Sequence, residues 1–375
     1  MKIGIITFHN VINYGATLQA LALQESIRKK SQDVSIINYT PIDVFSAYKP
    51  FSLIKNKRYA KNSLKRAVKS VASDARHFWF ISKRNKTFNE FGKKYFNYSG
   101  EACQSLDKLK KSLPDYDVCF AGSDQIWNPD ITYGFDSAYF LDFGKKNMVR
   151  ASYAASIGRE TFNSKEKQVL CEYLNEFDYI SLRERTAQNL LNTLTDKPIE
   201  VVLDPTLLLN ANDWRRLFSI QPQSKEYIFV YTLYPNPKLN LFVEKLSKLK
   251  NLPVVTINRK PVYSNEVERY PLADPCEFVS LIANAQYVVT NSFHGTAFSV
   301  NFSKNFITFT GERRNSRITD LLKILGISER AVADFSDELL DMDDIDYEKV
   351  QSKLNEERNK SEEYIDSVLE RAGKV

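Results

Sequence analysis

The sequence predicts an α/β fold made of two doubly wound, Rossmann-like domains. The chain has 375 residues, which is more than the roughly 250–300 at which single cores stop growing. Short apolar stretches alternate with segments of helical periodicity, a pattern typical of parallel sheets covered by helices on both faces. Hydrophobic residues make up 43% of the chain and charged residues 26%, so a sizeable core can be buried in each domain.

The first domain is expected over residues 1–205. It opens with a strand over 2–7, a helix over 15–30 and a second strand over 34–39, the order of a βαβ unit. Its further strands are expected over 117–121, 149–154 and 179–182. The segment 55–96 interrupts this alternation and is expected to be an inserted, basic helical segment.

The second domain is expected over residues 206–335. It follows Asp204-Pro205, which indicates a hinge because a residue before proline prefers an extended backbone. Strands are expected over 227–233, 254–257, 287–290 and 306–309, and helices over 237–249, 275–283, 295–302 and 316–325. The acidic segment 336–375 is expected to form a helix that packs back across the hinge. Two such domains facing a cleft make a GT-B-like architecture, and ligands bind beyond the carboxyl ends of the strands in such sheets.

Several functional classes are disfavoured by the composition. The segment MKIGIITFHN has too short an apolar stretch for a secretory signal, and no apolar run approaches the roughly 20 residues that span a bilayer. The protein is therefore expected to be cytoplasmic. The four cysteines lie far apart without a Cys-x-x-Cys pair, so neither a metal site nor a cofactor is expected.

The net charge of +6 is distributed unevenly. Between Lys55 and Lys94, thirteen Lys and Arg residues accompany only two acids and are interleaved with aromatic residues. The first interpretation is a pair of amphipathic helices with a solvated basic face. Peripheral contact with the inner face of an anionic membrane is the second. Nucleic-acid binding is a distant third, and no nucleic-acid partner is expected.

Polar residues follow the first strand of the first domain. Asn13, Tyr14, Gly15 and Gln19 surround the start of the first helix. Free N–H groups and a glycine at such a position suit an anion or the hydroxyls of a sugar. The alternative is that Asn13 merely caps the helix, and the sequence favours neither interpretation.

A second group of polar residues lies in FAGSDQIWNP, residues 120–129. A buried strand opens here into Ser123, Asp124, Gln125 and Trp127. Trp127 offers an apolar face for a sugar ring, while Asp124 and Gln125 supply directional hydrogen bonds. The alternative is an Asx-type turn beside a core tryptophan.

The strand end ISLRER, residues 180–185, is the third candidate. Arg183 follows the strand directly, and its planar guanidinium is suited to gripping a carboxylate or a phosphate. The alternative is an arginine paired with Glu184 or with another acid.

The strongest candidate lies in VVTNSFHGTAFSVNF, residues 288–302. Ser292 and His294 follow a buried strand, and Gly295 and Thr296 open a helix. Since histidine exchanges protons near neutral pH, we expect His294 to be catalytic rather than structural.

Three arginines follow the next strand, in a loop that is either an anion-binding edge or an exposed basic turn. They are Arg313, Arg314 and Arg317. Arg317 begins a helix and is the one expected to point into the cleft.

Together these segments resemble the polysaccharide pyruvyltransferase family. The matching pieces are NYGATLQALAL, FAGSDQIWNP, ISLRER, VVLDPTLLL and TNSFHGTAFS, in the family's order and over almost the whole chain. The resemblance implies a GT-B-like fold and transfer of the pyruvyl group of phosphoenolpyruvate onto two hydroxyls of a sugar, forming a cyclic ketal. Such sugars belong to cell-surface or exported polysaccharides. The acceptor is expected to be nucleotide-linked or lipid-linked.

The resemblance also implies roles for individual residues. The family's histidine falls on His294 and its donor-holding arginine on Arg183. Many members carry Arg-Leu-His where this chain has Ser292-Phe293-His294, so Ser292 is expected to act there with one of the three loop arginines. Donor binding is expected from Arg183, Ser292, Gly295, Thr296 and Arg317. Acceptor binding is expected from Asn13, Tyr14, Gly15, Gln19, Ser123, Gln125 and Trp127, with Asp124 as the base for the attacking hydroxyl.

Two alternative functions stay open. The first is a glycosyltransferase with a nucleotide-sugar donor, for which the segment Asp274 to Glu277 would supply an acid to the ribose. The second is a non-catalytic sugar-binding member of a polysaccharide assembly complex, and the missing arginine is its best support.

Overall fold

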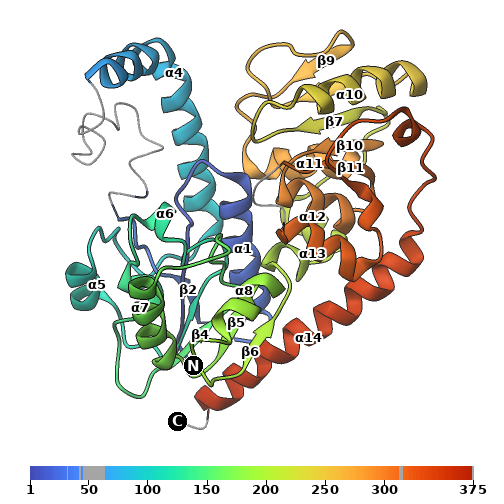
Figure 1. Ribbon diagram of the computed structural model, residues 1–375. Helices are drawn as coiled ribbons and strands as arrows, with labels where there is room; N and C mark the ends of the chain where they lie inside the picture. Colours follow the sequence, from blue (N-terminus) through green and yellow to red (C-terminus); the bar gives the residue numbers. More distant parts are fainter. Residues whose placement is uncertain (32, 42–43, 45–63, 312–315, 374–375) are drawn as a thin grey trace. The chain divides into compact units, whose positions relative to one another are not determined.

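The computed structural model describes residues 1–31, 33–41, 44, 64–311 and 316–373 (Figure 1). The chain divides into two compact units, Met1–Pro205 with Glu363–Val375, and Thr206–Glu362. Each unit contains a parallel sheet connected by helices. The predicted fold class, α/β with two doubly wound units, is confirmed.

The sheet of the first unit is parallel throughout. Its strands are β1 (Ile3–Ile6), β2 (Val34–Ile36), β3 (Val118–Ala121), β4 (Val149–Ser152), β5 (Ile180–Leu182) and β6 (Ile199–Val201). The order is β2-β1-β3-β4, and the pair β5-β6 extends it beyond β4. The extension is held by backbone bonds, since Ser152 N–H donates to Tyr179 O at 3.0 Å and Ala155 N–H to Ser181 O at 3.2 Å.

The strand order of the first unit reverses at β1. Because β2 lies on one side of β1 and β3 on the other, right-handed crossovers carry the connecting helices to opposite faces. The loops that follow β1 and β3 therefore diverge. Such a switch point is where doubly wound sheets bind their ligands.

The helices of the first unit are α1 (Tyr14–Arg28), α4 (Leu64–Tyr95), α5 (Leu106–Ser112), α6 (Pro129–Thr132), α7 (Ser164–Asn175) and α8 (Arg185–Leu191). Helix α4 lies within the expected helical insertion, whose first residues, 55–63, are outside the described part of the chain. The unpredicted helices α5 and α7 are amphipathic surface helices, each with few buried residues.

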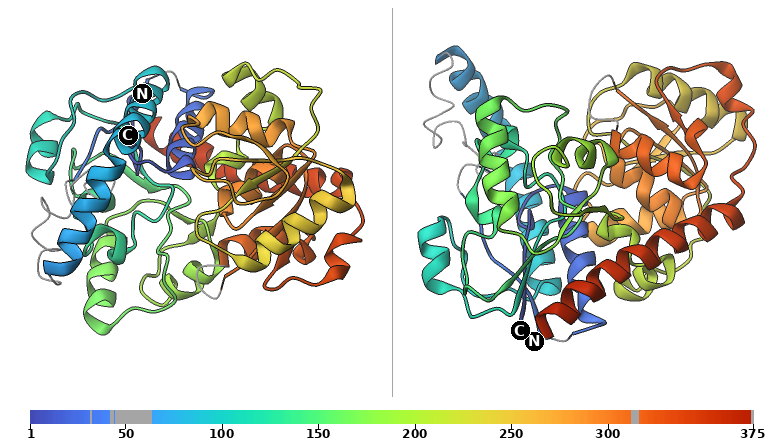
Figure 2. Two further views of the ribbon diagram at one scale, coloured as in Figure 1. Left: turned by 90° about the horizontal axis from the view of Figure 1, so that it is seen from above. Right: turned by 60° about the horizontal axis from the view of Figure 1, so that its bottom comes forward.

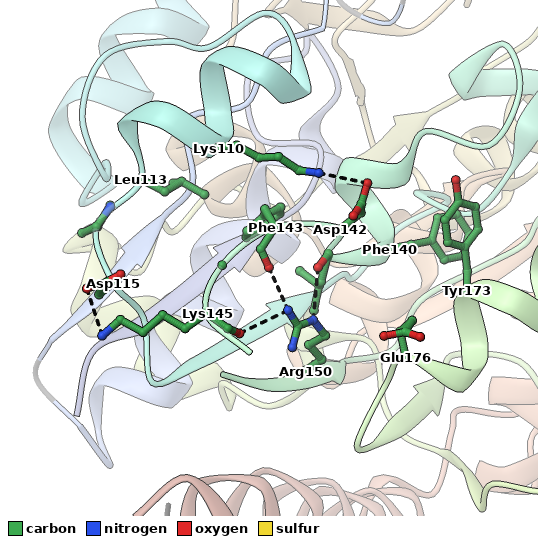
Figure 3. A pocket seen from close by; sticks show the side chains of 13 residues that line it. Lys110, Leu113, Asp115, Phe140, Asp142, Phe143, Lys145, Arg150, Tyr173 and Glu176 are labelled. Carbon is green, nitrogen blue, oxygen red and sulfur yellow. Dashed lines mark hydrogen bonds and ion pairs between the residues drawn. The ribbon is translucent and has the colours of Figure 1, made fainter. Parts of the chain in front are cut away.

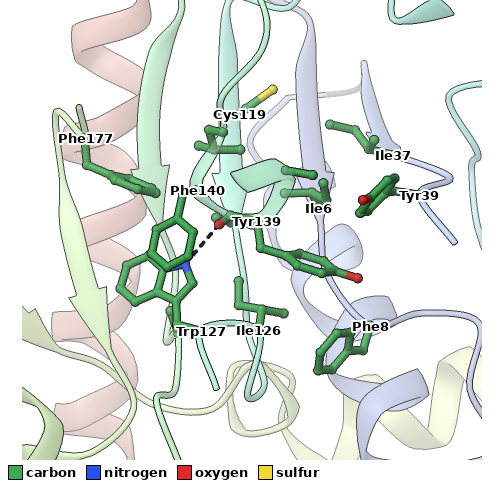
Figure 4. Packing of buried hydrophobic residues seen from close by; sticks show 14 of the residues in the cluster. Ile6, Phe8, Ile37, Tyr39, Cys119, Ile126, Trp127, Tyr139, Phe140 and Phe177 are labelled. Atoms are coloured by element: carbon green, nitrogen blue, oxygen red, sulfur yellow. Dashed lines mark hydrogen bonds between the residues drawn. The ribbon is translucent and has the colours of Figure 1, made fainter. Parts of the chain in front are cut away.

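The core of the first unit is built around stacked aromatic rings (Figure 4). Trp127 and Phe140 stack face to face, with ring centroids 5.2 Å apart and an interplanar angle of 8°. The edge of Phe177 meets Trp127 at 5.4 Å. The indole N–H of Trp127 donates to the backbone oxygen of Tyr139 at 2.9 Å, so the buried polar atom of the ring is satisfied.

The second unit contains one parallel sheet in the order β12-β11-β10-β7-β8-β9. Its strands are β7 (Ile228–Tyr231), β8 (Val254–Thr256), β9 (Glu266–Arg269), β10 (Tyr287–Thr290), β11 (Asn305–Phe309) and β12 (Ala331–Val332). Its helices are α9 (Ala211–Phe218), α10 (Pro237–Lys250), α11 (Pro275–Asn284), α12 (Phe293–Asn301) and α13 (Ser316–Leu325). Since β8 and β10 flank β7, the order reverses there, and the loops after β7 and β10 form its switch point.

Helix α14 (Tyr347–Gly373) belongs to both units. In the second unit, Arg358 donates from Nε to the Leu207 oxygen at 2.6 Å and from Nη2 to Asn301 Oδ1 at 2.9 Å. In the first unit, the Tyr364 hydroxyl donates to the Ser152 oxygen at 2.7 Å. The predicted helix is found, although residues 336–346 precede it as loop and a short 3-10 turn. Figure 2 shows the two chain ends close together on the first unit.

In the described ranges, no helix is both long enough and apolar enough to cross a bilayer.

The anchor of α14 in the first unit gives a testable prediction. Tyr364→Phe should lower the free energy of unfolding by about 1 kcal/mol, because a buried hydrogen bond is lost without a change in packing. Urea unfolding followed by circular dichroism measures it. Tyr234→Phe, which alters a partly exposed ring, should change the same quantity by less than about 0.5 kcal/mol. Equal effects of the two substitutions would contradict this role of Tyr364.

Candidate functional site

A buried glutamine joins the two loops at the switch point of the first unit. Gln19 Nε2 donates to Thr7 Oγ1 and to the Ala16 oxygen, both at 2.9 Å. Gln19 Oε1 accepts from the Ser123 N–H at 3.0 Å, and Thr7 Oγ1 donates to the Ser123 oxygen at 2.8 Å. Gln19 and Ser123 are fully buried. They hold the loops in place, and their expected contact with a sugar acceptor stays a prediction.

Other residues of the predicted acceptor set are also structural. Gln125 is buried, and its Oε1 accepts from Asn128 Nδ2 at 2.8 Å. Trp127 has 0% of its surface exposed, because Phe140 and Phe177 cover it. The expectation that Trp127 offers a face to a sugar ring is wrong. The alternative weighed from the sequence, a core tryptophan, describes this residue.

The residues at the start of α1 also have structural roles, in capping the helix and in packing. Asn13 Oδ1 accepts from the Ala16 N–H at 3.2 Å and so caps the helix. Tyr14 and Gly15 are buried, and the Tyr14 ring packs on Phe88 with centroids 5.3 Å apart. Of these residues only Asn13 keeps part of its side chain near solvent.

Asp124 is the residue of the β3 loop that reaches solvent. Its side chain is 15% exposed, and Oδ1 accepts from the Gln125 N–H at 2.8 Å. The backbone φ of 73° places Asp124 in the left-handed region. A residue other than glycine in that region carries a conformational cost that is often found at functional sites.

Arg183 lies among three carboxylates. Nη1 is 2.7 Å from Asp204 Oδ2, Nη2 is 3.7 Å from Asp124 Oδ1, and Nε is 3.8 Å from Glu184 Oε1. Burial alone would lower the pKa of Arg183, but the carboxylates of Asp204, Glu184 and Asp124 outweigh it and raise the pKa. The guanidinium therefore stays charged.

This acidic cluster corrects the role expected for Arg183. One cation faces three carboxylates, so with all four groups ionised the cluster is net negative and would repel an anionic donor. The alternative of an arginine paired with acids is what the structure contains. Of the three acids, only Asp124 has an appreciably exposed side chain.

A buried asparagine joins the corresponding loops of the second unit. Asn291 Oδ1 accepts from the Leu233 N–H at 2.7 Å, and Nδ2 donates to the Tyr234 oxygen at 2.9 Å. Sequence reasoning assigned no role to Asn291 or Tyr234. A polar residue at the end of a buried strand was the signal that could have indicated this role. Its partners could not be identified from the sequence, because they lie almost sixty positions earlier in the chain.

The start of α12 carries the predicted histidine. Ser292 caps the helix, with Oγ accepting from the Gly295 N–H at 3.3 Å. Thr296 is buried and bonds to Thr308 Oγ1 at 2.7 Å. A Cβ on Gly295 would lie 2.4 Å from Thr290 Oγ1, so only glycine allows this close approach. These three predicted donor-binding residues shape the helix start rather than offer side chains to a ligand.

His294 is 8% exposed and lies in the first turn of α12. Its ring meets that of Phe293 edge-on, with centroids 5.1 Å apart. The guanidinium carbon of Arg317 lies 5.9 Å from the centroid of the same Phe293 ring. The structure therefore brings His294 and Arg317 against one aromatic side chain, that of Phe293. Arg313 and Arg314 lie outside the described residues.

The loop that follows β7 lies at the same carboxyl end of the second sheet as the start of α12. Tyr234 and Leu233 are exposed, and a Cβ on Gly311 would lie 2.8 Å from the Tyr234 hydroxyl. The ring of Tyr234 therefore packs over the loop that follows β11. Asp274, considered as a ribose ligand, instead caps α11 by accepting from the Glu277 N–H at 2.7 Å.

The comparison with known families decides the classification. The sequence matches the family described as polysaccharide pyruvyl transferase over residues 13–313. The chain belongs to this family. No curated protein matches the sequence.

Solved structures resemble this pyruvyl transferase at low sequence identity. A UDP-GlcNAc 2-epimerase of Methanocaldococcus jannaschii, in complex with UDP-GlcNAc and UDP, is 16% identical, with 98% of this chain and 99% of that chain covered and a TM-score of 0.45. The E. coli heptosyltransferase WaaC with ADP is 11% identical, with 95% and 100% covered and a TM-score of 0.41. UGT71G1 of Medicago truncatula, complexed with UDP-glucose, is 13% identical, with 99% and 98% covered and a TM-score of 0.41.

A hollow of about 580 Å³ lies elsewhere on the first unit of the pyruvyl transferase (Figure 3). Most of its lining residues precede β3 and β4, at the amino ends of the strands, and Arg150 of β4, Tyr173 of α7 and Glu176 complete the lining. Lys110 pairs with Asp142 at 3.2 Å and Lys145 with Asp115 at 2.9 Å. Arg150 donates to several backbone oxygens of the preceding loop. Since it lies at the amino ends of the strands, away from the switch point, we do not assign the active site to it.

Across the described ranges, no group of three or more His, Cys, Asp or Glu side chains is arranged to hold a metal ion.

The burial of Trp127 predicts a large loss of stability on truncation. Trp127→Ala should lower the free energy of unfolding by about 3–5 kcal/mol, because a large buried ring is replaced by a cavity. Urea unfolding followed by circular dichroism measures it, and Trp127→Phe should cost clearly less. A folded Trp127→Ala protein of unchanged stability, with weakened sugar binding, would restore the acceptor role.

The acidic cluster predicts that Arg183 is needed for folding. Arg183→Met should lower the free energy of unfolding by about 3–5 kcal/mol, because three neighbouring carboxylates lose their counter-charge. Arg185→Met, at an exposed position two residues away, is the matched control and should change it by less than about 0.5 kcal/mol. If both variants unfold at the same urea concentration, Arg183 is not the structural partner of these acids.

Proposed function

We propose that this pyruvyl transferase moves the pyruvyl group of phosphoenolpyruvate onto two hydroxyls of one sugar during synthesis of a cell-surface or exported polysaccharide. Family membership supports the reaction class. The observation that carries the residue assignment is the position of His294, in the first turn of α12 at the switch point of the second unit. We propose that the protein acts in the cytoplasm, where phosphoenolpyruvate is produced.

The proposed donor site is the edge formed by His294 and Arg317. Phosphoenolpyruvate carries a carboxylate and a phosphate, and both favour the positive end of a helix and a guanidinium. Many family members use the arginine of an Arg-Leu-His sequence. Here Ser292 occupies that position and is committed to capping α12. Arg317, held over Phe293, is the cation that we assign to this task.

The proposed reaction begins with a proton from His294 to the methylene carbon of phosphoenolpyruvate. That carbon becomes a methyl group, and the neighbouring C2 becomes an electrophile. One sugar hydroxyl adds to C2 and the bond from C2 to the phosphate oxygen breaks. A second hydroxyl then closes the ketal. Two hydroxyl protons are released. That of the attacking hydroxyl passes through a base to the departing phosphate, and that of the second hydroxyl restores His294. C2 stays at the oxidation level of a ketone, so no redox cofactor is required.

We assign Asp124 as the base that receives the proton of the attacking hydroxyl. Its side chain is 15% exposed, and the guanidinium of Arg183 lies 3.7 Å from Oδ1 as a neighbouring positive charge. The sugar that supplies the hydroxyls is proposed to be nucleotide-linked or lipid-linked, with phosphoenolpyruvate as the co-substrate.

The assay is release of phosphate from phosphoenolpyruvate by purified protein, with a panel of nucleotide-linked and lipid-linked sugars. His294→Gln and Asp124→Asn should each lower kcat by about 10²-fold or more, the usual effect of losing a general acid or base. Arg317→Gln should mainly raise KM for phosphoenolpyruvate, and Arg317→Lys should recover part of the loss. Arg185→Met is the control and should keep wild-type rates.

Two results would overturn the proposal. The first is wild-type turnover by folded His294→Gln protein. The second is the lack of phosphate release with any acceptor, together with no binding of phosphoenolpyruvate in calorimetry. Tight binding of a nucleoside diphosphate in that second case would instead favour a glycosyltransferase.

A further inference from the structure

One side of α4 combines exposed aromatic and basic residues. Trp79 is 68% exposed and Phe78 49% exposed, which is unusual for side chains of this size. In residues 78–95 the sequence has five Lys and Arg residues and a single acid, Glu90. The basic face of α4 is defined here as Trp79, Lys83, Lys86, Lys93 and Lys94, all of which are exposed.

Helical geometry places these residues together. Lys83, Lys86 and Lys93 follow Trp79 by four, seven and fourteen positions, which repeats one side of an α-helix. The ammonium of Lys83 lies 4.9 Å from the centroid of the Trp79 ring. Glu90 interrupts the face and pairs with Lys86 at 3.7 Å.

The opposite side of α4 anchors the helix to the first unit. Phe88 and Phe91 are buried, and Phe88 packs on Tyr14 of α1. The guanidinium of Arg84 lies 5.7 Å from the Tyr14 ring. Because Arg84, Phe88 and Phe91 contact the first unit from one side of α4, the basic face on the other side is turned to solvent. Figure 1 shows the amino-terminal part of α4 extending beyond the sheet.

We propose that the basic face of α4 binds the surface of an anionic lipid bilayer. Lysines near such a surface contribute about 1 kcal/mol each, and tryptophan is favoured at the boundary between headgroups and acyl chains. A convex helix surface offers no enclosing pocket for a small ligand, so the charge complementarity fits an extended anionic surface. The proposal stands independently of the reaction assigned to the second unit.

The chain contains its own reporter for the test. Trp127 and Trp214 are completely buried, and the sequence has three tryptophans, so Trp79 alone is accessible. Purified full-length protein is mixed with vesicles of phosphatidylcholine, or of phosphatidylcholine with phosphatidylglycerol. Only the anionic vesicles should shift the fluorescence emission of Trp79 to shorter wavelength and protect Trp79 from quenching by acrylamide. Only these vesicles should also co-sediment with the protein. Trp79→Phe should abolish the fluorescence change while most sedimentation persists.

Charge reversal tests the basic face directly. Lys83→Glu/Lys86→Glu/Lys93→Glu should weaken binding to anionic vesicles at least about tenfold, since three favourable charges become unfavourable. The matched control is Lys248→Glu/Lys250→Glu at the end of α10, where both lysines flank the exposed Leu249. It should bind vesicles like the wild type. Circular dichroism checks that both proteins fold, and phosphate release checks that the charge-reversed protein is active.

Three outcomes would overturn the membrane proposal. The first is equal sedimentation with neutral and anionic vesicles. The second is equal weakening by the α4 and α10 substitutions. The third is the absence of vesicle binding together with salt-dependent binding of single-stranded or duplex nucleic acid, which would assign the face to that partner instead.

Discussion

A buried side-chain amide connects the diverging loops at the strand reversal of each unit. Gln19 does so between β1 and β3, and Asn291 between β7 and β10. A reversal in strand order opens the space in which a ligand can lie, but it also leaves two loop backbones without a neighbouring strand. Each amide supplies both a donor and an acceptor. Gln19 donates to Thr7 after β1 and accepts from Ser123 after β3, while Asn291, which follows β10, bonds to Leu233 and Tyr234 after β7. The residues proposed for catalysis lie next to these two connections in the sequence. Asp124 comes directly after Ser123, the partner of Gln19, and His294 comes three positions after Asn291.

The two switch points differ in charge. That of the first unit contains Arg183 with Asp124, Glu184 and Asp204, so acids outnumber the cation. That of the second unit presents a helix start with His294 and Arg317. A carboxylate base and an anionic donor need opposite electrostatic surroundings. The chain carries an acidic cluster on the first unit and a helix start with a cation on the second, which is why we propose the base on the first and the donor site on the second.

The sequence was sufficient for the fold class and for most of the longer elements, because their apolar spacing is repeated over several turns or residues. It did not reveal β6, β9 or β12, since β6 and β12 have three and two residues and β9 is partly exposed. Candidate site residues were harder to assign. A polar residue after a strand can face a ligand or a distant loop, and Gln19 meets Ser123 across 104 positions. Likewise, Trp127 could be placed in the core only once Phe140 and Phe177 were known to cover it.

Helix α14 gives the first unit a discontinuous construction, because its last turns return to a sheet whose strands all lie before residue 205. During synthesis, β4 leaves the ribosome long before Tyr364, its partner through Ser152. The second unit, by contrast, is a continuous stretch of chain. A nascent protein can therefore assemble its second unit while its first is still incomplete. Premature termination just after Glu362 would leave the first unit incomplete, although the stop lies next to the second unit in the sequence.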